Sequence, residues 1–268
     1  MNCILERVAE TQSTNDDLLG RWRAGQLTDP IARIAYKQTS GKGRAGRSWL
    51  ANPNDTLCFS YAYPFQQSPK DLSGLSLVVG LAVISGIAAA LHLEQSQLYA
   101  QGLRLKWPND LLLNNAKLGG ILIEGGQAKA NDPTWMVIGV GLNLRNAPSI
   151  ENRLEGSSAQ KVSAVDQLQR ENAPLPDIEV LWLKLIEAFE RYLPEFERVG
   201  FNAYQAQWNE WDAYKDLAVN ITGVGKESIY GQAAGVDKTG ALILDQNGKM
   251  LTIHAGDVSM RVQSWVFI

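Results

Sequence analysis

Residues 41–49 read Gly-Lys-Gly-Arg-Ala-Gly-Arg-Ser-Trp, so three glycines stand among three cations. Glycine permits backbone conformations that turn several N–H groups inward, and arginine offers a planar pair of donors that matches a carboxylate or a phosphate. The run therefore suits a phosphate ester or an acyl phosphate. A solvated, flexible basic loop has the same composition, so the run alone leaves both interpretations open.

The same run lies one residue away from a Walker A P-loop, because Gly41 and Gly46 are followed by Arg47-Ser48 where that motif has lysine before serine or threonine. A P-loop needs a helix that begins directly after it, so that the helix N-terminus faces the phosphates. Here the chain continues into Asn-Pro-Asn-Asp at 52–55, which favours a turn before a strand. We therefore reject the P-loop interpretation.

Two predicted strands flank the basic loop, one over Ile31–Tyr36 and one over Thr56–Tyr63. Although the formal net charge is −3, the segment from Ile31 to Arg47 carries five cations and no acid. These cations are Arg33, Lys37, Lys42, Arg44 and Arg47. At the end of the loop, the indole of Trp49 can stack on adenine, although a loop tryptophan is as often a simple hydrophobic anchor.

Ser13-Thr14-Asn15 separates a predicted strand over Cys3–Val8 from a predicted helix over residues 16–24. All three residues are good N-cap types, so helix capping is their plainest interpretation. Leu72–Leu93 carries no Asp, Glu, Lys or Arg and is long enough to span a bilayer. Its serines, glycines and alanines, without basic flanks, indicate a buried core helix instead.

A second polar cluster, Lys106-Trp107-Pro108-Asn109-Asp110, ends a predicted strand over Leu103–Lys106. Asn109 and Asp110 suit a metal or ribose contact, but polar residues after proline are also ordinary turn material. Lys117 begins the second strand of a predicted hairpin. It matters for chemistry only if that strand carries it towards the basic loop.

Gly139 and Gly141 alternate in an apolar strand predicted over Trp135–Leu144, just before Asn143. Such glycines leave room for a flat ligand against the backbone, or for a packed helix. The next stretch, 145–176, is polar and is predicted to lie on the surface or to be mobile.

The end of the chain changes character near residue 216. Asp177 caps one predicted helix, and a second is predicted over Phe201–Tyr214. Beyond them, short strands and tight turns such as Asn247-Gly248 indicate a small β-barrel. We therefore predict two domains, 1–215 and 216–268.

The bulk composition excludes several classes of protein. A charged fraction of 20% with a net charge of −3 gives no sign of nucleic-acid binding. Two cysteines and two histidines do not make an ordinary zinc site, and they favour a reducing, cytoplasmic setting. Glu6, Arg7 and Glu10 interrupt any secretory signal.

Taken in order, the clusters at 13–15, 41–49, 106–110, 117–124 and 139–143 resemble the biotin–protein ligases. The resemblance implies an α/β fold of the α+β type: a mixed sheet flanked by helices, related to class II aminoacyl-tRNA synthetases, with a small C-terminal SH3-like β-barrel. It implies that ATP, with Mg²⁺, activates biotin to biotinyl-adenylate, and that biotin then passes to a lysine of a biotin carboxyl carrier protein domain.

The resemblance also implies residue roles. Lys117 and Arg44 would be catalytic, with Lys117 touching the reacting carboxylate and phosphate oxygens. The residues that would bind biotin are Ser13, Thr14, Asn15, Gln38, Lys42, Gly43, Arg44 and Lys117. Those that would bind ATP or the adenylate are Arg47, Trp49, Lys106, Asn109, Asp110 and Asn143. The metal ligands are left unassigned.

Two departures from the family pattern affect these expectations. Lys42 stands where the family often has arginine, which keeps the charge but loses bidentate geometry. About a dozen residues precede Ser13, where repressor members carry a DNA-binding domain. We therefore expect the short form of the family, with no binding to DNA or membranes; exposed strand edges allow a homodimer.

Two alternatives remain. A lipoate ligase or related acyltransferase uses the same scaffold, although Trp49 and the terminal barrel favour biotin. A non-catalytic biotin-binding protein would keep the pocket, but the neutral rings of biotin need neither a cationic loop nor Lys117.

Overall fold

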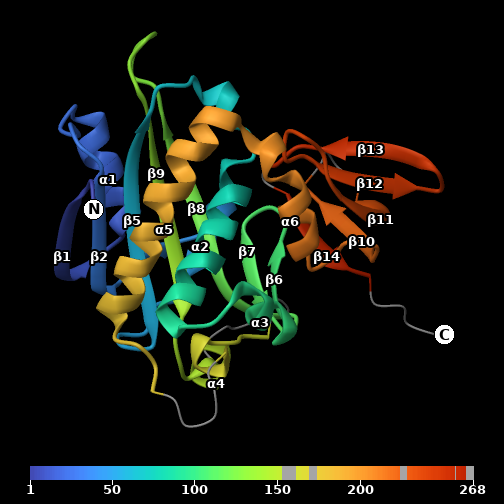
Figure 1. Cartoon of the computed structure of the whole chain (residues 1–268), viewed down its shortest axis with the longest axis horizontal. Helices are drawn as coiled ribbons and strands as arrows, with labels where there is room; N and C mark the ends of the chain where they lie inside the picture. Colours follow the sequence, from blue (N-terminus) through green and yellow to red (C-terminus); the bar gives the residue numbers. More distant parts are fainter. Residues whose placement is uncertain (153–160, 169–173, 224–227, 257, 264–268) are drawn as a thin grey trace.

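Two β-sheets organise the computed structural model, which describes residues 1–152, 161–168, 174–223, 228–256 and 258–263 (Figure 1). The larger sheet has seven strands in the order β1-β2-β5-β9-β8-β7-β6. Its strands are β1 (Ile4–Thr11), β2 (Ile31–Gln38), β5 (Thr56–Phe65), β6 (Leu103–Lys106), β7 (Asp110–Leu113), β8 (Ala116–Gly126) and β9 (Thr134–Asn143).

This large sheet is mixed, as the sequence predicts. The strands β1 and β2 run parallel, and every other neighbouring pair is antiparallel. Between β2 and β5 the basic loop forms a two-stranded ribbon from β3 (Gly41–Lys42) and β4 (Ser48–Trp49). No helix begins directly after the glycine run, so the rejection of a P-loop is confirmed.

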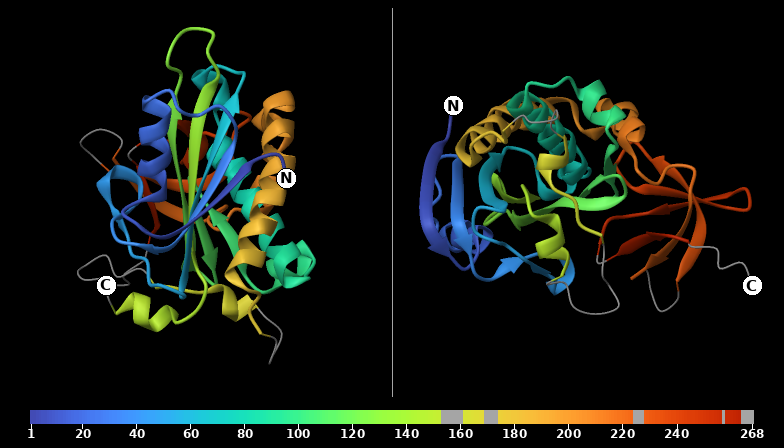
Figure 2. Two further views of the ribbon diagram at one scale, coloured as in Figure 1. Left: turned by 90° about the vertical axis from the view of Figure 1, so that its left-hand side faces the viewer. Right: turned by 90° about the horizontal axis from the view of Figure 1, so that it is seen from below.

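Helices cover both faces of the large sheet, and the alternation of side chains along β5 shows which face each helix covers. Ala62 packs in the apolar cluster of α1 (Thr14–Arg23). The next side chain along, Tyr61, faces the other way and meets Phe189 of α5 (Ile178–Val199) edge-on at 5.8 Å. Figure 2 shows α5 together with α2 (Leu75–Leu91) over one face. The side chains with the parity of Ala62 therefore lie on the face of α1.

The first helix begins two residues earlier than the sequence predicts. Ser13 is its N-cap, and its Oγ accepts a hydrogen bond from the Asp16 amide at 3.3 Å. Acidic Asp16 and Asp17 in the first turn and basic residues in the last turn match the helix dipole. Because the cap is Ser13, Thr14 and Asn15 occupy the first turn, where both are buried.

The apolar segment predicted as a core helix is α2, which has 17 residues and packs against α5. Fourteen of its residues are buried inside the protein. Within the described ranges, no helix is both long and apolar enough to cross a membrane.

The C-terminal strands form a five-stranded antiparallel sheet in the order β13-β12-β11-β10-β14. Its strands are β10 (Ala218–Thr222), β11 (Ile229–Val236), β12 (Leu242–Gln246), β13 (Lys249–Ile253) and β14 (Ser259–Val262). In the described part of the chain the edge strands β13 and β14 are not paired, so the small β-barrel that the sequence predicts takes the form of an open five-stranded sheet.

Two other segments differ from expectation. Part of the polar stretch 145–176 is ordered: it contains α4 (Ala147–Glu151), and Ser163, Val165 and Leu168 are buried. Residues 153–160 and 169–173 of that stretch lie outside the described residues. The helix predicted over Phe201–Tyr214 is shorter, because a 3₁₀ turn precedes α6 (Gln205–Trp211). The remaining short helix is α3 (Gln95–Ala100).

Candidate active site

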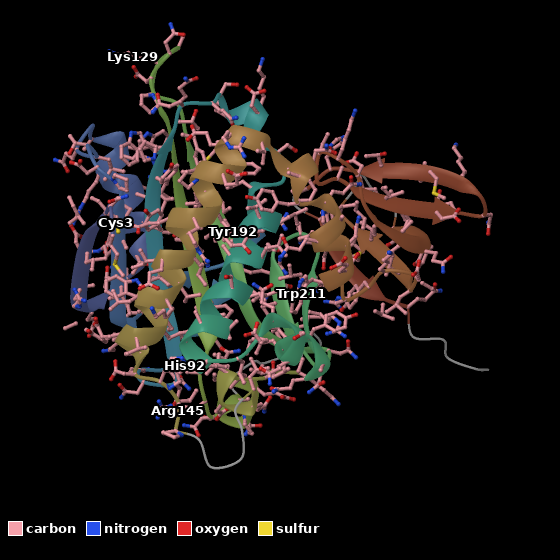
Figure 3. All side chains as sticks on the ribbon, in the orientation of Figure 1. Cys3, His92, Lys129, Arg145, Tyr192 and Trp211 are labelled. Atoms are coloured by element: carbon pink, nitrogen blue, oxygen red, sulfur yellow. The ribbon has the colours of Figure 1, made fainter. Side chains whose placement is uncertain are left out.

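A cavity of about 490 Å³ opens on the α1 face of the large sheet, between the basic loop and the C-terminal sheet. In Figure 3, Lys129 marks one end of the β8–β9 hairpin and Arg145, two residues beyond Asn143, marks the other. All fourteen residues that the sequence singles out line this cavity. They are Ser13, Thr14, Asn15, Gln38, Lys42, Gly43, Arg44, Arg47, Trp49, Lys106, Asn109, Asp110, Lys117 and Asn143.

The charges lining the cavity are strongly unbalanced. Asp110 is the one carboxylate among the described lining residues, against six cations. The cations are Lys42, Arg44, Arg47, Lys106, Lys117 and, from the C-terminal sheet, Arg261. Such an excess of positive charge raises the local concentration of anions, so the cavity suits a ligand with several negative charges.

Asp110 lies between two lysines. Its Oδ1 is 2.7 Å from Nζ of Lys117, and its Oδ2 is 3.4 Å from Nζ of Lys106. Burial alone would raise the pKa of Asp110, but the two ammonium groups outweigh it and hold the pKa below the ordinary value. Burial lowers the pKa of Lys106, and repulsion from Lys117 adds to that effect against the attraction of Asp110. The carboxylate thus stays ionised and keeps both lysines at the cavity wall.

The three cations of the basic loop make different contacts. Arg44 donates to Oδ1 of Asn109 at 3.0 Å and to the carbonyl of Gly256 in the C-terminal part. Arg47 donates to the carbonyl of Arg44 at 3.1 Å, and Lys42, half exposed at the rim, pairs with Asp16 at 2.7 Å.

Two of the five cations counted in the sequence do not line the cavity. Arg33 pairs with Glu6 at 2.7 Å and Asp17 at 2.8 Å, and Lys37 pairs with Glu10 at 2.8 Å. Of the five cations between Ile31 and Arg47, therefore, only the three in the glycine run belong to the site.

Trp49 and Asn143 lie at the β9 side of the cavity. The indole of Trp49 rests on Gly141, where a Cβ would lie 2.7 Å from the indole Nε1. Nδ2 of Asn143 donates to the carbonyls of Lys117 and Ser163, both at 3.2 Å. Within the described chain, Oδ1 of Asn143 and Nε1 of Trp49 are buried without a hydrogen-bond partner. The oxygen of Asn143 is therefore available to a ligand.

At the α1 side, neutral polar groups replace the charges. Oε1 of Gln38 accepts from the Thr14 amide at 3.0 Å, and the hydroxyl of Thr14 lies 2.7 Å from that of Ser60. Ser60 donates to Oδ1 of Asn15 at 2.6 Å. A Cβ on Gly139 would lie 3.0 Å from Cγ of Asn15, so this glycine makes room for helix α1 rather than for a ligand.

Sequence reasoning missed several lining residues. Ser60 is completely buried, and its signal was a serine in the middle of the mostly apolar strand Thr56–Phe65. Tyr214, Ser259 and Arg261 come from the C-terminal part. No local pattern marks them, since only the packing of the two sheets brings them to the cavity.

The chain belongs to the biotin/lipoate A/B protein ligase family, whose model matches residues 7–143. A second model of the same family matches residues 81–210, and the biotin protein ligase C-terminal domain matches residues 218–261. Together the three matches cover strands of both the large sheet and the C-terminal sheet.

Curated relatives cover most of the chain. The bifunctional ligase/repressor BirA of Salmonella typhimurium is 33% identical, over 93% of this chain and 72% of the relative. The biotin–[acetyl-CoA-carboxylase] ligase of Mycobacterium tuberculosis is 31% identical, over 95% of this chain and 88% of the relative. The ligase of that name from Paracoccus denitrificans is 29% identical, over 94% and 98%.

Solved structures share the fold. The biotin protein ligase of Aquifex aeolicus in complex with biotin and ATP superimposes with a TM-score of 0.74 at 22% identity, covering 97% of this chain and 99% of that chain. The ligase of Leishmania major in complex with biotin gives a TM-score of 0.58 at 21% identity, covering 94% and 98%.

Proposed function

We propose that this chain joins biotin to ATP as biotinyl-adenylate and transfers the biotinyl group to a lysine of a biotin carboxyl carrier protein. One observation carries the proposal: six cations converge on a cavity whose other end is neutral and polar. A ligand with a neutral polar ring, a carboxylate and a triphosphate partner matches that division. The names of the curated relatives support the same reaction.

In the first step, a carboxylate oxygen of biotin attacks the α-phosphorus of ATP, and the bond to pyrophosphate breaks. Two anions must approach each other, so concentrated positive charge lowers the barrier. We assign this role to Lys117 and Arg44 as the catalytic residues. In the second step, the carrier lysine amine attacks the acyl carbon, loses a proton, and AMP leaves.

The binding roles follow the two ends of the cavity. Ser13, Thr14, Asn15 and Gln38 would hold the ureido ring, and Lys42 and Gly43 would lie along the valerate and phosphate. Arg47, Lys106, Asn109 and Asp110 would serve the nucleotide phosphates and ribose. Trp49 would stack on adenine, and the buried, unpaired Oδ1 of Asn143 would accept from its amino group.

Magnesium fits this cavity as part of the substrate MgATP. The carboxylate of Asp110 already pairs with two lysines. In the described ranges, no group of three His, Cys, Asp or Glu side chains could hold a metal. We therefore propose that Mg²⁺ arrives on the phosphates. Chelation by EDTA should abolish turnover, and excess Mg²⁺ should restore it.

The proposal extends to partners and organisation. We propose a catalytic domain over 1–215 and a C-terminal domain over 216–268. In the C-terminal domain, the carbonyl of Gly256 accepts a hydrogen bond from Arg44. Free cysteines support a cytoplasmic setting, and the net charge of −3 supports an activity without DNA or membrane binding. The edge strand β1, with Ile4 47% exposed, offers a surface for a homodimer.

The test is mass-spectrometric detection of biotinyl-AMP after incubation with biotin, ATP and Mg²⁺. ATP–pyrophosphate exchange, measured with biotin and with lipoate in parallel, separates the two ligase alternatives. We expect exchange with biotin; exchange supported by lipoate alone would replace biotin with lipoate as substrate. Binding of biotin without any exchange would indicate the non-catalytic alternative.

A further inference from the structure

A continuous chain of hydrogen-bonded side chains connects the outside of the neutral pocket with its interior. It begins at Glu124 on β8, whose Oε2 accepts from Nδ2 of Asn15 at 3.0 Å. Ser60 on β5 follows, 2.6 Å from Oδ1 of Asn15, and then Thr14, 2.7 Å from Ser60. Glu124 is not among the residues that line the cavity, so it acts on any ligand through the others.

The direction of each hydrogen bond in this chain is determined by its outer end. An ionised carboxylate only accepts, and so does the carbonyl of Leu122, 3.4 Å from the same nitrogen of Asn15. The amide nitrogen of Asn15 must therefore face outward and its oxygen inward. That oxygen takes the single hydrogen of Ser60, so Ser60 can only accept from Thr14.

The hydroxyl of Thr14 consequently donates its hydrogen to Ser60. Its other neighbour, Oε1 of Gln38, is 3.3 Å away, a longer separation than the 2.7 Å to Ser60. Towards the cavity Thr14 thus presents only lone pairs. Ser13 has the opposite polarity, because its Oγ accepts from the Asp16 amide and its own hydrogen remains to be donated.

Gln38 completes the pattern. Its Oε1 is held by the Thr14 amide at 3.0 Å, so its Nε2 turns towards the basic loop, beside Gly41. The pocket therefore offers one acceptor, Thr14, and two donors, Ser13 and Gln38. A ring with an N–H next to a carbonyl, as in a cyclic urea, matches this arrangement.

We propose that Ser60 and Glu124 are positioning residues that fix the hydrogen-bond polarity of the pocket and thereby select a ring with an N–H facing Thr14. This inference rests on the proposed function, since biotin supplies the cyclic urea. Removal of Ser60 leaves the Thr14 hydrogen with the longer 3.3 Å contact to Oε1 of Gln38, so the hydroxyl can turn and donate to a ligand instead. The pocket then no longer prefers a ligand with an N–H facing Thr14 over a ligand with an acceptor atom in the same position.

The experiment uses the whole chain and two cyclic carbamate analogues of biotin, each with one ring N–H replaced by oxygen. ATP–pyrophosphate exchange gives kcat/KM for each compound. In the wild type, the analogue whose oxygen faces Thr14 should be poorer than the other by about ten-fold or more, because two acceptors then meet. We call this ratio the regioisomer gap.

In Ser60→Ala the regioisomer gap should close to within about two-fold, while the KM for ATP stays unchanged. Glu124→Met, which removes the outer anchor without touching the cavity, should narrow the gap in the same direction. Glu124→Gln keeps an acceptor and should keep the gap. Ser85→Ala, on α2, is the matched control, because it removes a buried hydroxyl that does not line the cavity.

The outcomes separate the two hypotheses. Two results would overturn the polarity assignment and leave the ligase function intact. The first is exchange with biotin but no regioisomer gap in the wild type, and the second is a regioisomer gap that is unchanged in Ser60→Ala and Glu124→Met. Absence of exchange with biotin in the wild type overturns both. If Ser60→Ala does not fold, Glu124→Met decides alone.

Discussion

Lys117 shows how a single side chain acquires its place in the site. It is the second residue of β8, and its amide and carbonyl bond the backbone of Lys161 and Ser163 at 2.7 and 2.9 Å. Its ammonium group is fixed by Asp110 at 2.7 Å and lies 6.0 Å from the ring centre of Trp49. The backbone bonds thus fix the position of Lys117 in the strand, and the buried carboxylate of Asp110 fixes the position of its ammonium group.

Lys117→Ala should retain biotin binding and lose about 10²- to 10³-fold in adenylate formation, the usual effect of removing one group that stabilises developing charge. Biotin affinity by calorimetry and turnover by pyrophosphate exchange check the two halves separately. Lys184→Ala, on the surface of α5, is the control because, among the residues that the structure describes, Lys184 pairs only with Glu187 of the same helix. Unchanged turnover in Lys117→Ala would remove this residue from the mechanism.

For single residues, the sequence identified the site residues that belong to short local motifs. The glycine run, the 106–110 cluster and Lys117 each carry a residue type that the cavity uses. Ser60 was missed because a hydroxyl inside a strand is usually a satisfied core group. Its importance comes from Thr14 and Asn15, which lie 46 and 45 residues away along the chain.

The strand β9 joins both halves of the site through its two glycines. Gly139 makes room for the amide of Asn15, and Gly141 makes room for the indole of Trp49. The two residues share a face, because side chains two apart in a strand point the same way. One element thus supports the neutral pocket at one glycine and the indole at the next.

Substitutions in β9 should therefore affect different substrates. In Gly139→Ala the new methyl group displaces Asn15, which should raise the KM for biotin by about ten-fold. In Gly141→Ala it displaces Trp49 and should raise the KM for ATP instead. Each change should also cost about 1–3 kcal/mol of stability through overpacking.

The control for both variants is Gly20→Ala in α1, where a Cβ would meet nothing within 4 Å. This variant should keep both KM values and gain up to about 1 kcal/mol from helix propensity. Steady-state kinetics with each substrate varied in turn gives the comparison. Equal changes in both KM values for Gly139→Ala and Gly141→Ala would contradict separate roles for the two glycines.

Most strands and long helices were predictable, because apolar periodicity and cap residues are local signals. The open edges of the C-terminal sheet were not predictable, since periodicity indicates which residues form strands and not which strands pair with each other. The buried segment at Ser163–Leu168 was also missed. Its polar composition hides the fact that Lys117 pairs with Val162 in a parallel bridge.

In the whole molecule, the two sheets meet at the site. Trp107 donates to the carbonyl of Gly240 at 3.1 Å, and Ser73 donates to that of Thr239 at 2.7 Å. Together with the contact from Arg44 to Gly256, these bonds bring Tyr214 and Arg261 to the cavity. Long-range packing of this kind has no sequence signature, which is why the C-terminal contribution could not be predicted.

Asp212 lies at this junction, where α6 ends and the chain continues to β10. Its residue is 9% exposed, and its Oδ1 accepts from the Tyr214 amide at 2.9 Å. Within the described residues its Oδ2 is buried without a partner. Burial raises the pKa of this carboxyl to about 6, from an ordinary value of 3.8.

This raised pKa makes the stability of the junction depend on pH. The folded protein holds the proton more tightly than the unfolded chain, so the favourable contribution of protonated Asp212 is complete below about pH 4 and is lost as pH rises to about 6. Asp212→Asn, which cannot ionise, should therefore exceed the wild type in free energy of unfolding by up to about 3 kcal/mol at pH 7.5. At pH 4 the difference should nearly vanish.

Urea unfolding at the two pH values measures this difference. Asp29→Asn is the control, because Asp29 is exposed and is not among the charges that act on the pKa of Asp212. It should change the free energy of unfolding by the same small amount at both pH values. If Asp212→Asn shifts the free energy of unfolding equally at pH 4 and pH 7.5, the carboxyl does not titrate between them. The junction is then held by packing and by the hydrogen bonds from the side chains of Trp107 and Ser73 to the carbonyls of Gly240 and Thr239.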